Sequence, residues 1–362
     1  MAEIKFFKAG CGDAARIRYE GNDGQIHNVF IDSGFERTFR SVLAEEVRAI
    51  AVAGEVVDLW VVSHIHDDHI GGVIKYIKAI TTGELKDIVH EWYYNVPRTP
   101  PPVGSAIAIS QAMSIGQGDS LAAYLQSIGG LHPNDIVAGM PALDLWGLKI
   151  TVLSPNKNGL SRLREKYPNG STNPLERIED DSISEAKART PSDYHIKLED
   201  FPLDRWKEDC SIENGSSIAL LIESRDKNTL WLADAFPSVV SQSLRNLGYS
   251  LENPIVCEWV KVAHHGSIGN NSNELYELID CNNYIITANG ENKYNLPAKE
   301  CIARILRNSN RKPDSHYNIY FTDDNRMLRS LFSNEEAKIE ERLRFSAHYL
   351  ERDQNMWVFS LP

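Results

Sequence analysis

Three histidines and two aspartates fall within six consecutive residues, in the order His-Ile-His-Asp-Asp-His. Imidazole nitrogens and carboxylate oxygens are the ligands that Zn²⁺ and related divalent ions take from proteins. Protonated imidazoles this close would repel one another, and they fill a core poorly. We therefore predict a metal site rather than a loop that is rich in histidine by chance, with four ligands: His64, His66, Asp68 and His69.

The neighbouring residues indicate how this cluster is positioned. An apolar run at 59–62 precedes it and is typical of a buried strand. Gly71 and Gly72 follow, and apolar side chains then recur at helical spacing, which predicts a helix over 73–80. Reactive groups are often placed on loops between such elements. The pattern therefore favours a metal loop between a strand and a helix.

A second group of chemically capable residues lies some 200 positions later, at another strand end. His264 and His265 follow the run Lys261-Val-Ala and precede a glycine and Ser267. Because adjacent residues of a strand point in opposite directions, we do not expect both histidines to bind the same ion. We assign His264 to the metal and His265 to proton transfer or phosphate contact, although the two roles are interchangeable at this stage.

The His-x-His-x-Asp-His pattern followed by Gly-Gly resembles the metal-binding signature of the metallo-β-lactamase superfamily. The resemblance implies an αββα sandwich, an α/β fold that the recurring strand-then-helix pattern also favours. It further implies that Asp234, at a strand end, bridges two ions. It implies that Asp32 supports the metal loop without binding metal itself, and Asp13 is predicted to lie beside that loop in a similar supporting role.

A narrower resemblance rests on five motifs that occur in order between residues 4 and 306. They are Gly10-Cys-Gly-Asp13, the histidine cluster, Asn214-Gly-Ser-Ser217, Ala233-Asp234 and Lys261-Val-Ala-His-His-Gly-Ser267. Together they resemble the hydrolase domain of the DNA-uptake channel ComEC and its stand-alone cytosolic relatives. Some of those relatives belong to bacterial phage-defence operons, so the resemblance implies a nucleic-acid or nucleotide substrate and partner proteins from such an operon.

The chain departs from these families at two places. Leu296 stands where similar proteins carry a histidine, in Asn292-Lys-Tyr-Asn-Leu-Pro297. The wider superfamily also completes its first metal site with a histidine from the middle of the chain. The candidates between the cluster and Asp234 are His90, His132 and His195, and none lies in a context that favours metal binding.

Length and charge limit the organisation and the partners. We expect one domain over 1–362, with a charged insertion at 156–211 bordering the site and a C-terminal extension at 309–362 completing the fold. The net charge of −12 disfavours tight binding to long duplex DNA or to an anionic membrane. Five scattered cysteines and a start without a basic, apolar leader favour a cytoplasmic protein. Oligomerisation stays open.

The leading functional hypothesis is a metal-dependent hydrolase that cleaves a phosphodiester with metal-bound hydroxide. We expect two Zn²⁺ ions, with Mn²⁺ as the alternative, and Asp68 holding and deprotonating the water. Lys261, Lys293, Ser267 or a tandem histidine would stabilise charge on the phosphate. Two alternatives are hydrolysis of an ester or lactone, and a non-catalytic metal-binding sensor module within a multi-protein assembly.

Overall fold

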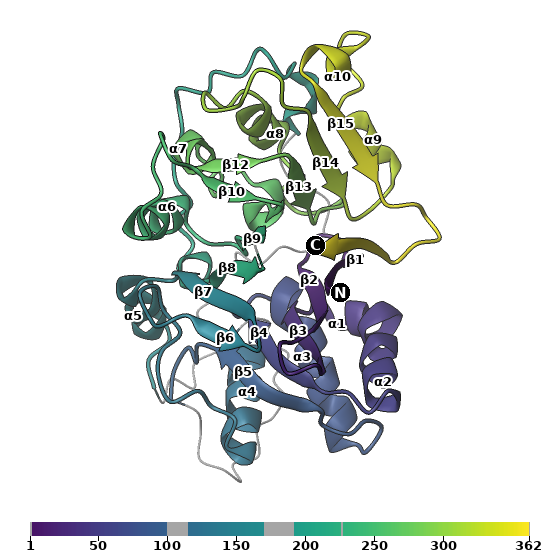
Figure 1. Cartoon of the computed structure of the whole chain (residues 1–362), viewed down its shortest axis with the longest axis vertical. Helices are drawn as coiled ribbons and strands as arrows, with labels where there is room; N and C mark the ends of the chain where they lie inside the picture. Colours follow the sequence, from purple (N-terminus) through teal and green to yellow (C-terminus); the bar gives the residue numbers. More distant parts are fainter. Residues whose placement is uncertain (1, 100–114, 170–191, 226, 362) are drawn as a thin grey trace.

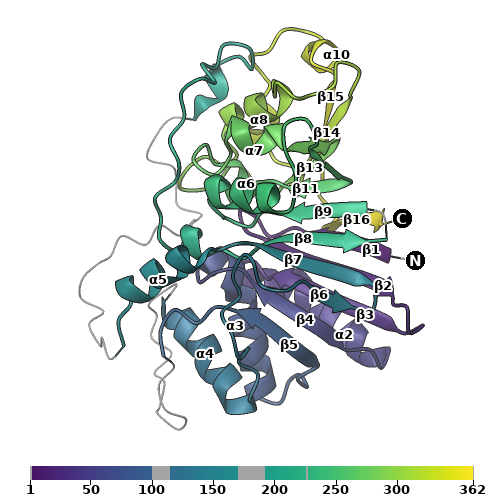
Figure 2. The same cartoon turned by 60° about the vertical axis from the view of Figure 1, so that its left-hand side comes forward.

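Two β-sheets pack face to face, and helices cover the outer face of each (Figures 1 and 2). The computed structural model describes residues 2–99, 115–169, 192–225 and 227–361. One apolar core lies between the two sheets. A further core lies between the first sheet and its helices, and another lies between the second sheet and its helices. The predicted αββα sandwich is confirmed.

The first sheet has six strands in the order β16-β1-β2-β3-β4-β5. Its N-terminal strands form an antiparallel meander, and β3, β4 and β5 run parallel. The bounds are Ala2–Phe7 for β1, Ala14–Glu20 for β2, Ile26–Asp32 for β3, Val57–Val62 for β4, Val89–Tyr94 for β5 and Met356–Leu361 for β16.

The second sheet has eight strands in the order β15-β14-β13-β11-β9-β8-β7-β6, with β9 to β15 parallel. A separate parallel pair joins β10 and β12. The bounds are Leu143–Leu145 for β6, Leu148–Ser154 for β7, Ala219–Ser224 for β8, Lys227–Trp231 for β9, Ile255–Cys257 for β10, Trp259–Lys261 for β11, Ile279–Cys281 for β12, Asn283–Ile286 for β13, Tyr317–Phe321 for β14 and Phe345–Tyr349 for β15.

The helices divide between the two outer faces. The short helix α1 (Glu36–Thr38) precedes a π-helical turn (Phe39–Leu43), and this turn contributes to the core on the first sheet together with α2 (Ala44–Val52), α3 (Asp67–Thr81), α4 (Ile115–Ile128) and α5 (Lys157–Lys166). Those that contribute to the core on the second sheet are α6 (Pro237–Asn246), α7 (Asn273–Glu277), α8 (Lys299–Leu306), α9 (Arg326–Ser330) and α10 (Ile339–Arg342). Short 3-10 turns occur at Asp193–His195, Asn214–Ser216 and Ala263–Gly266.

Strand β4 is buried along its whole length because it lies between β3 and β5 and is covered on both faces. Leu59 and Val61 face the opposite sheet, whereas Trp60 and Val62 pack beneath the helices. This strand, which is apolar from Leu59 to Val62, ends at the metal loop and thereby fixes the loop's position in the sandwich.

The helix after the metal loop begins earlier than the predicted 73–80. Helix α3 starts at Asp67, so Asp68 and His69 lie in its first turn, where carboxylates are favoured by the helix dipole. The glycines do not begin the helix; they allow it to approach the loop after β3. A Cβ on Gly72 would lie 2.3 Å from the backbone oxygen of Ser33, so a larger residue would push α3 away.

Segments distant in sequence complete both sheets. Strand β16 pairs antiparallel with β1, and β14 and β15 form one edge of the second sheet. Of the predicted insertion at 156–211, residues 170–191 lie outside the described part. The segment that follows, from residue 192, packs Tyr194, Leu198 and Phe201 into the core between the second sheet and its helices. Among the described residues, no helix is long and apolar enough to cross a bilayer.

Candidate metal centre

Three strand ends deliver the candidate ligands to one edge of the sandwich. The metal loop follows β4 of the first sheet, Asp234 follows β9 of the second, and the tandem histidines follow β11. Strands β9 and β11 are parallel neighbours, so the loops after them emerge at the same edge of the sheet. Ile218, just before β8, donates its amide to the carbonyl of Ser63, which ties the two sheets together here.

The first group of potential ligands consists of His64, His66 and Asp234, whose ligand atoms lie within 4.8 Å of one another. His64 Nε2 is 3.8 Å from Asp234 Oδ2. His264 Nε2 lies 3.6 Å from the same carboxylate oxygen. His264 Nε2 therefore lies beside the first group, facing the same Asp234 oxygen as His64 Nε2.

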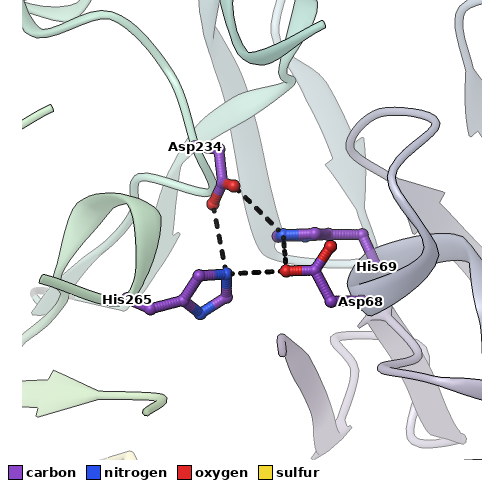
Figure 3. A group of neighbouring side chains, drawn as sticks. All are labelled: Asp68, His69, Asp234 and His265. Atoms are coloured by element: carbon purple, nitrogen blue, oxygen red, sulfur yellow. Dashed lines mark ion pairs between the residues drawn. The ribbon is translucent and has the colours of Figure 1, made fainter. Parts of the chain in front are cut away.

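The second group consists of Asp68, His69, Asp234 and His265, and Figure 3 shows the four side chains converging. Asp68 Oδ2 lies 3.1 Å from His265 Nε2 and 3.6 Å from His69 Nε2. The two Asp234 oxygens lie 3.3 Å from His69 Nε2 and 3.7 Å from His265 Nε2. Atoms bound tetrahedrally to zinc at about 2.0–2.1 Å are separated by roughly 3.3 Å, so these spacings suit one ion.

The tandem histidines reach different groups because they lie in a turn and not on a strand. Their φ angles are 44° and 52°, a left-handed conformation that is uncommon outside glycine. Ala233, next to Asp234, has φ 45° and Asp32 has φ 55°. Strained residues of this kind concentrate at functional sites, where the surrounding structure holds them. His265 therefore lies among the candidate ligands, and His264 also lies beside Asp234, so the structure brings both histidines to the centre.

The metal-facing atoms share a property that tests whether an ion fits. Among the described residues they are buried and lack a hydrogen-bond partner: Nε2 of His64, His66, His69, His264 and His265, and both carboxylate oxygens of Asp68 and of Asp234. An unpaired buried polar atom costs about 1–3 kcal/mol. Such a concentration of open nitrogen and oxygen donors is satisfied by divalent cations, and this donor set suits Zn²⁺.

Asp32 supports His69 from behind. Its Oδ2 accepts a hydrogen bond from His69 Nδ1 at 2.9 Å, and its two oxygens also accept the amide and hydroxyl of Ser63 at 2.7 and 2.9 Å. A carboxylate behind a ligating histidine fixes which ring nitrogen is protonated. Asp32 thus contacts the ring nitrogen of His69 that faces away from Asp234.

Asp13 and Lys261 form a buried ion pair beneath the centre. Both are fully buried, and the Lys261 ammonium contacts Asp13 Oδ2 and the carbonyl of Ala233. Asp13 Oδ1 also accepts the hydroxyl of Thr287 at 2.6 Å. Lys261 therefore neutralises Asp13 and does not face solvent, which corrects its predicted contact with a substrate phosphate.

Burial and neighbouring charges set the protonation of the centre. Burial lowers the pKa of His64 well below its ordinary value, and the adjacent His69 and His66 rings act in the same direction. Burial also disfavours charge on His69, but the surrounding carboxylates, Asp234 first among them, raise its pKa well above the usual range. Burial would raise the pKa of Asp234, and the nearby histidines outweigh it and lower that pKa well below normal.

The other sequence candidates lie elsewhere. His90 lines a hollow of about 500 Å³ beside the start of β4, His132 bonds the carbonyl of Asn134, and His195 bonds that of Ser192. Leu296 packs into the core between the second sheet and its helices, and the Lys293 ammonium lies over the Tyr294 ring. Ser267 donates to Asn270, which in turn contacts His264.

Two residues of the centre were not identified from the sequence. Asn270 and Asp209 both surround His264, yet neither belongs to a motif or a recognisable strand end. Asp209 comes from the segment that was expected to border the site, but nothing in its local sequence distinguished it from the other acidic residues there.

Residues 26–94 match the metallo-β-lactamase superfamily. This segment runs from β3 to β5 and contains the histidine cluster. No protein with a curated description matches the chain. Among solved structures it is similar to CmlA, a diiron β-hydroxylase from Streptomyces venezuelae (10% identity, TM-score 0.40, 99% of this chain and 54% of that one). The present chain thus spans about half of CmlA.

Two further solved structures are themselves metallo-β-lactamases. One is a mutant enzyme from Cronobacter sakazakii (11% identity, TM-score 0.30, 67% of this chain and 72% of that one). The other is MIM-1 from Novosphingobium pentaromativorans (13% identity, TM-score 0.28, 71% and 74%). Superpositions this weak carry no information on substrate, so the argument for function rests on the site.

Proposed function

We propose that the protein is a metal-dependent hydrolase of phosphodiesters, with a nucleic acid or a nucleotide-sized molecule as substrate. The observation that carries the proposal is the pair of buried donor groups that share Asp234. Divalent ions held there would lower the pKa of a water molecule and stabilise charge on phosphoryl oxygens. The superfamily match over the histidine cluster supports hydrolysis, and the ComEC-like order of the motifs favours a phosphodiester over a carbon ester.

The chain's own residues have separable tasks in this proposal. His64, His66 and His264 would hold one ion, and His69, His265 and Asp68 the other, with Asp234 between them. Asp68 Oδ1 has no hydrogen-bond partner among the described residues and is the atom available to accept a proton from the attacking water.

The net charge of −12 favours a compact substrate over long duplex DNA. A short nucleic acid or a cyclic nucleotide presents fewer phosphates for the protein to neutralise, so its binding needs no extended basic surface. Partner proteins from a defence operon remain part of the proposal, supported by the ComEC-like order of the motifs.

The test compares two chromogenic substrates, bis(p-nitrophenyl) phosphate and p-nitrophenyl acetate, with purified protein in Zn²⁺ or Mn²⁺. Linear DNA, RNA and cyclic nucleotides follow. We expect phosphodiester cleavage that is abolished in His66→Ala. Cleavage of the acetate alone would favour an ester hydrolase. Bound metal with no cleavage of any of these substrates would favour the sensor module and overturn the proposal.

A further inference from the structure

Asn270 connects two of the candidate ligands through a single side chain. It lies between the tandem-histidine turn and α7 and is almost fully buried. Its Oδ1 lies 2.7 Å from His264 Nδ1 and also accepts the Ser267 hydroxyl at 2.6 Å. Its Nδ2 donates to the carbonyl of Asp234 at 2.9 Å and to Asp209 Oδ2 at 3.2 Å.

These contacts determine the orientation of the amide. The carbonyl of Asp234 can only accept a hydrogen bond, so the nitrogen of Asn270 must face it. The oxygen of Asn270 must then face the His264 ring. An amide oxygen only accepts, so Nδ1 of His264 must carry the proton. A neutral His264 ring then has its lone pair on Nε2, the atom that lies 3.6 Å from Asp234 Oδ2.

We propose that Asn270 is a positioning residue that holds His264 as an Nε2 ligand and fixes Asp234 beside it. The inference rests on the metal centre of the proposed function. Three other histidines of the centre have different partners on Nδ1: the hydroxyl of Ser63 for His64, the carboxylate of Asp32 for His69, and the carbonyl of Thr287 for His265. His264 has the neutral amide oxygen of Asn270 as its nearest partner at 2.7 Å, with Asn214 Nδ2 at 3.4 Å and Asp209 Oδ2 at 3.9 Å from the same ring nitrogen.

Asp209 gives the amide a charged partner on its far side. Its Oδ2 also accepts the side-chain nitrogen of Asn214 at 2.7 Å. A carboxylate that accepts from Nδ2 polarises the amide and strengthens its oxygen as an acceptor, because linked hydrogen bonds reinforce one another. Asp209, Asn270 and His264 therefore form one hydrogen-bonded series that leads to the metal-facing nitrogen.

The segment that carries Asp209 is fixed from α8. Arg304, which is almost fully buried, donates to the carbonyls of Leu203 and Arg205 at 3.1 and 2.7 Å. The amide of Asp209 then bonds the carbonyl of Gly269 at 3.0 Å, directly before Asn270. The returning end of the predicted insertion is thereby tied to the loop that holds His264.

The test compares Asn270→Ala with Asn271→Ala. Asn271 is a buried amide of the same loop, but it bonds the carbonyls of Ala263 and Ser267 and the hydroxyl of Tyr276, and no histidine ring. Titration with Co²⁺, followed by calorimetry and the visible spectrum, reports each ion without a substrate. We expect Asn270→Ala to weaken one of two ions by about 10–100-fold and alter its spectrum, whereas Asn271→Ala retains both.

A rescue variant separates positioning from general damage to the loop. The double substitution Asp209→Asn with Asn270→Asp keeps an acceptor facing His264 and avoids two adjacent carboxylates, but it removes the donor to the carbonyl of Asp234. We expect its Co²⁺ affinity to lie between those of Asn270→Ala and the unsubstituted protein. Unchanged binding in Asn270→Ala, or an equal loss in Asn271→Ala, would overturn the inference.

The metal readout also keeps this inference distinct from the proposed reaction. If the protein binds two ions with the expected pattern but cleaves no substrate, the hydrolase proposal fails and the role of Asn270 stands. If the unsubstituted protein binds no divalent ion, both fail.

Discussion

His27 and His69 are both buried beside aspartates, two around His27 and four around His69, yet their ring nitrogens are satisfied differently. His27 Nδ1 lies 3.0 Å from Asp58 Oδ1, and its Nε2 lies 3.1 Å from Asp23 Oδ1. His69 bonds Asp32 through Nδ1 only, and its Nε2 has no hydrogen-bond partner among the described residues. Both ring nitrogens of His27 therefore have partners, whereas His69 keeps Nε2 as an electron-pair donor for a metal ion.

The two histidines also mark opposite ends of one strand. Asp58 lies near the start of β4, and the metal loop follows its end. At the His27 end, hydrogen bonds and the stacked Trp146 ring, with centroids 4.1 Å apart, account for the polar atoms. The presence of histidines beside carboxylates therefore does not define a metal site; convergent buried atoms without partners do.

The largest expected effect comes from Asp234→Asn, because this residue borders both donor groups. Loss of a shared anionic ligand should remove at least one ion and reduce hydrolysis by about 10³-fold or more, given that a bound metal contributes several kcal/mol. Elemental analysis and the phosphodiester assay measure both. His27→Gln is the matched control and should keep its metal and activity. Full metal content in Asp234→Asn would contradict the assignment of Asp234 as a ligand shared by both donor groups.

Lys261→Met should reduce stability more than it reduces metal binding. Removing one partner of a buried ion pair costs about 3–5 kcal/mol, since Asp13 would remain buried and unpaired. Urea denaturation measures the loss, and adding Asp13→Asn should restore part of it. Lys227→Met, which breaks an exposed pair with Glu258, should cost less than about 1 kcal/mol. Unchanged stability with lost activity would return Lys261 to a substrate-contacting role.

Much of the centre could be predicted because its residues follow strands that are plain in the sequence. The apolar run of β4 locates the metal loop, and Asp234 follows a comparable run in the second half. Side-chain alternation failed at the tandem histidines, because it assumes extended backbone and their φ angles are positive. The separate destinations of His264 and His265 are set by that turn.

The supporting residues could not be predicted, because each acts through a contact between distant segments. Lys261 appeared available at a strand end, but its burial depends on Asp13 from the first turn of the chain. Asn270 and Asp209 are 61 positions apart, and the segment just before Asp209 is held by Arg304 of α8. Such roles follow from packing and leave no local pattern.

His27, whose two ring nitrogens both contact carboxylates, should make the free energy of unfolding depend on pH. Burial alone would lower the pKa of His27, but hydrogen bonds to Asp58 and Asp23 raise it above the ordinary value. A raised folded-state pKa means that the contribution is complete below about pH 6.5 and is lost as pH rises through the folded value. Urea denaturation of wild type and His27→Gln across pH 6–9 should therefore show a difference that shrinks with pH. A constant difference would mean that the ring contributes by packing alone.

Trp146→Asn should have the smallest net effect on stability, because two contributions oppose each other. Trp146 has φ 47° in the two-residue turn between β6 and β7, where asparagine is favoured and a bulky residue costs about 1 kcal/mol. Its ring stacks on His27, and an aromatic contact with a cation contributes about 0.5–1 kcal/mol. The unfolding free energy should change little, while the pKa of His27, measured by NMR titration, should fall.

Trp146→Phe keeps both the ring and the backbone strain, so it should leave the pKa of His27 close to that of wild type. This pair of variants separates the ring contact from the turn geometry. A loss of more than about 2 kcal/mol in Trp146→Asn would exceed the ring contact alone. It would show that Trp146 connects the β6–β7 hairpin of the second sheet to the β2–β3 hairpin of the first. The packing around His27 would then depend more on Trp146 than on the contacts of His27 with Asp23 and Asp58.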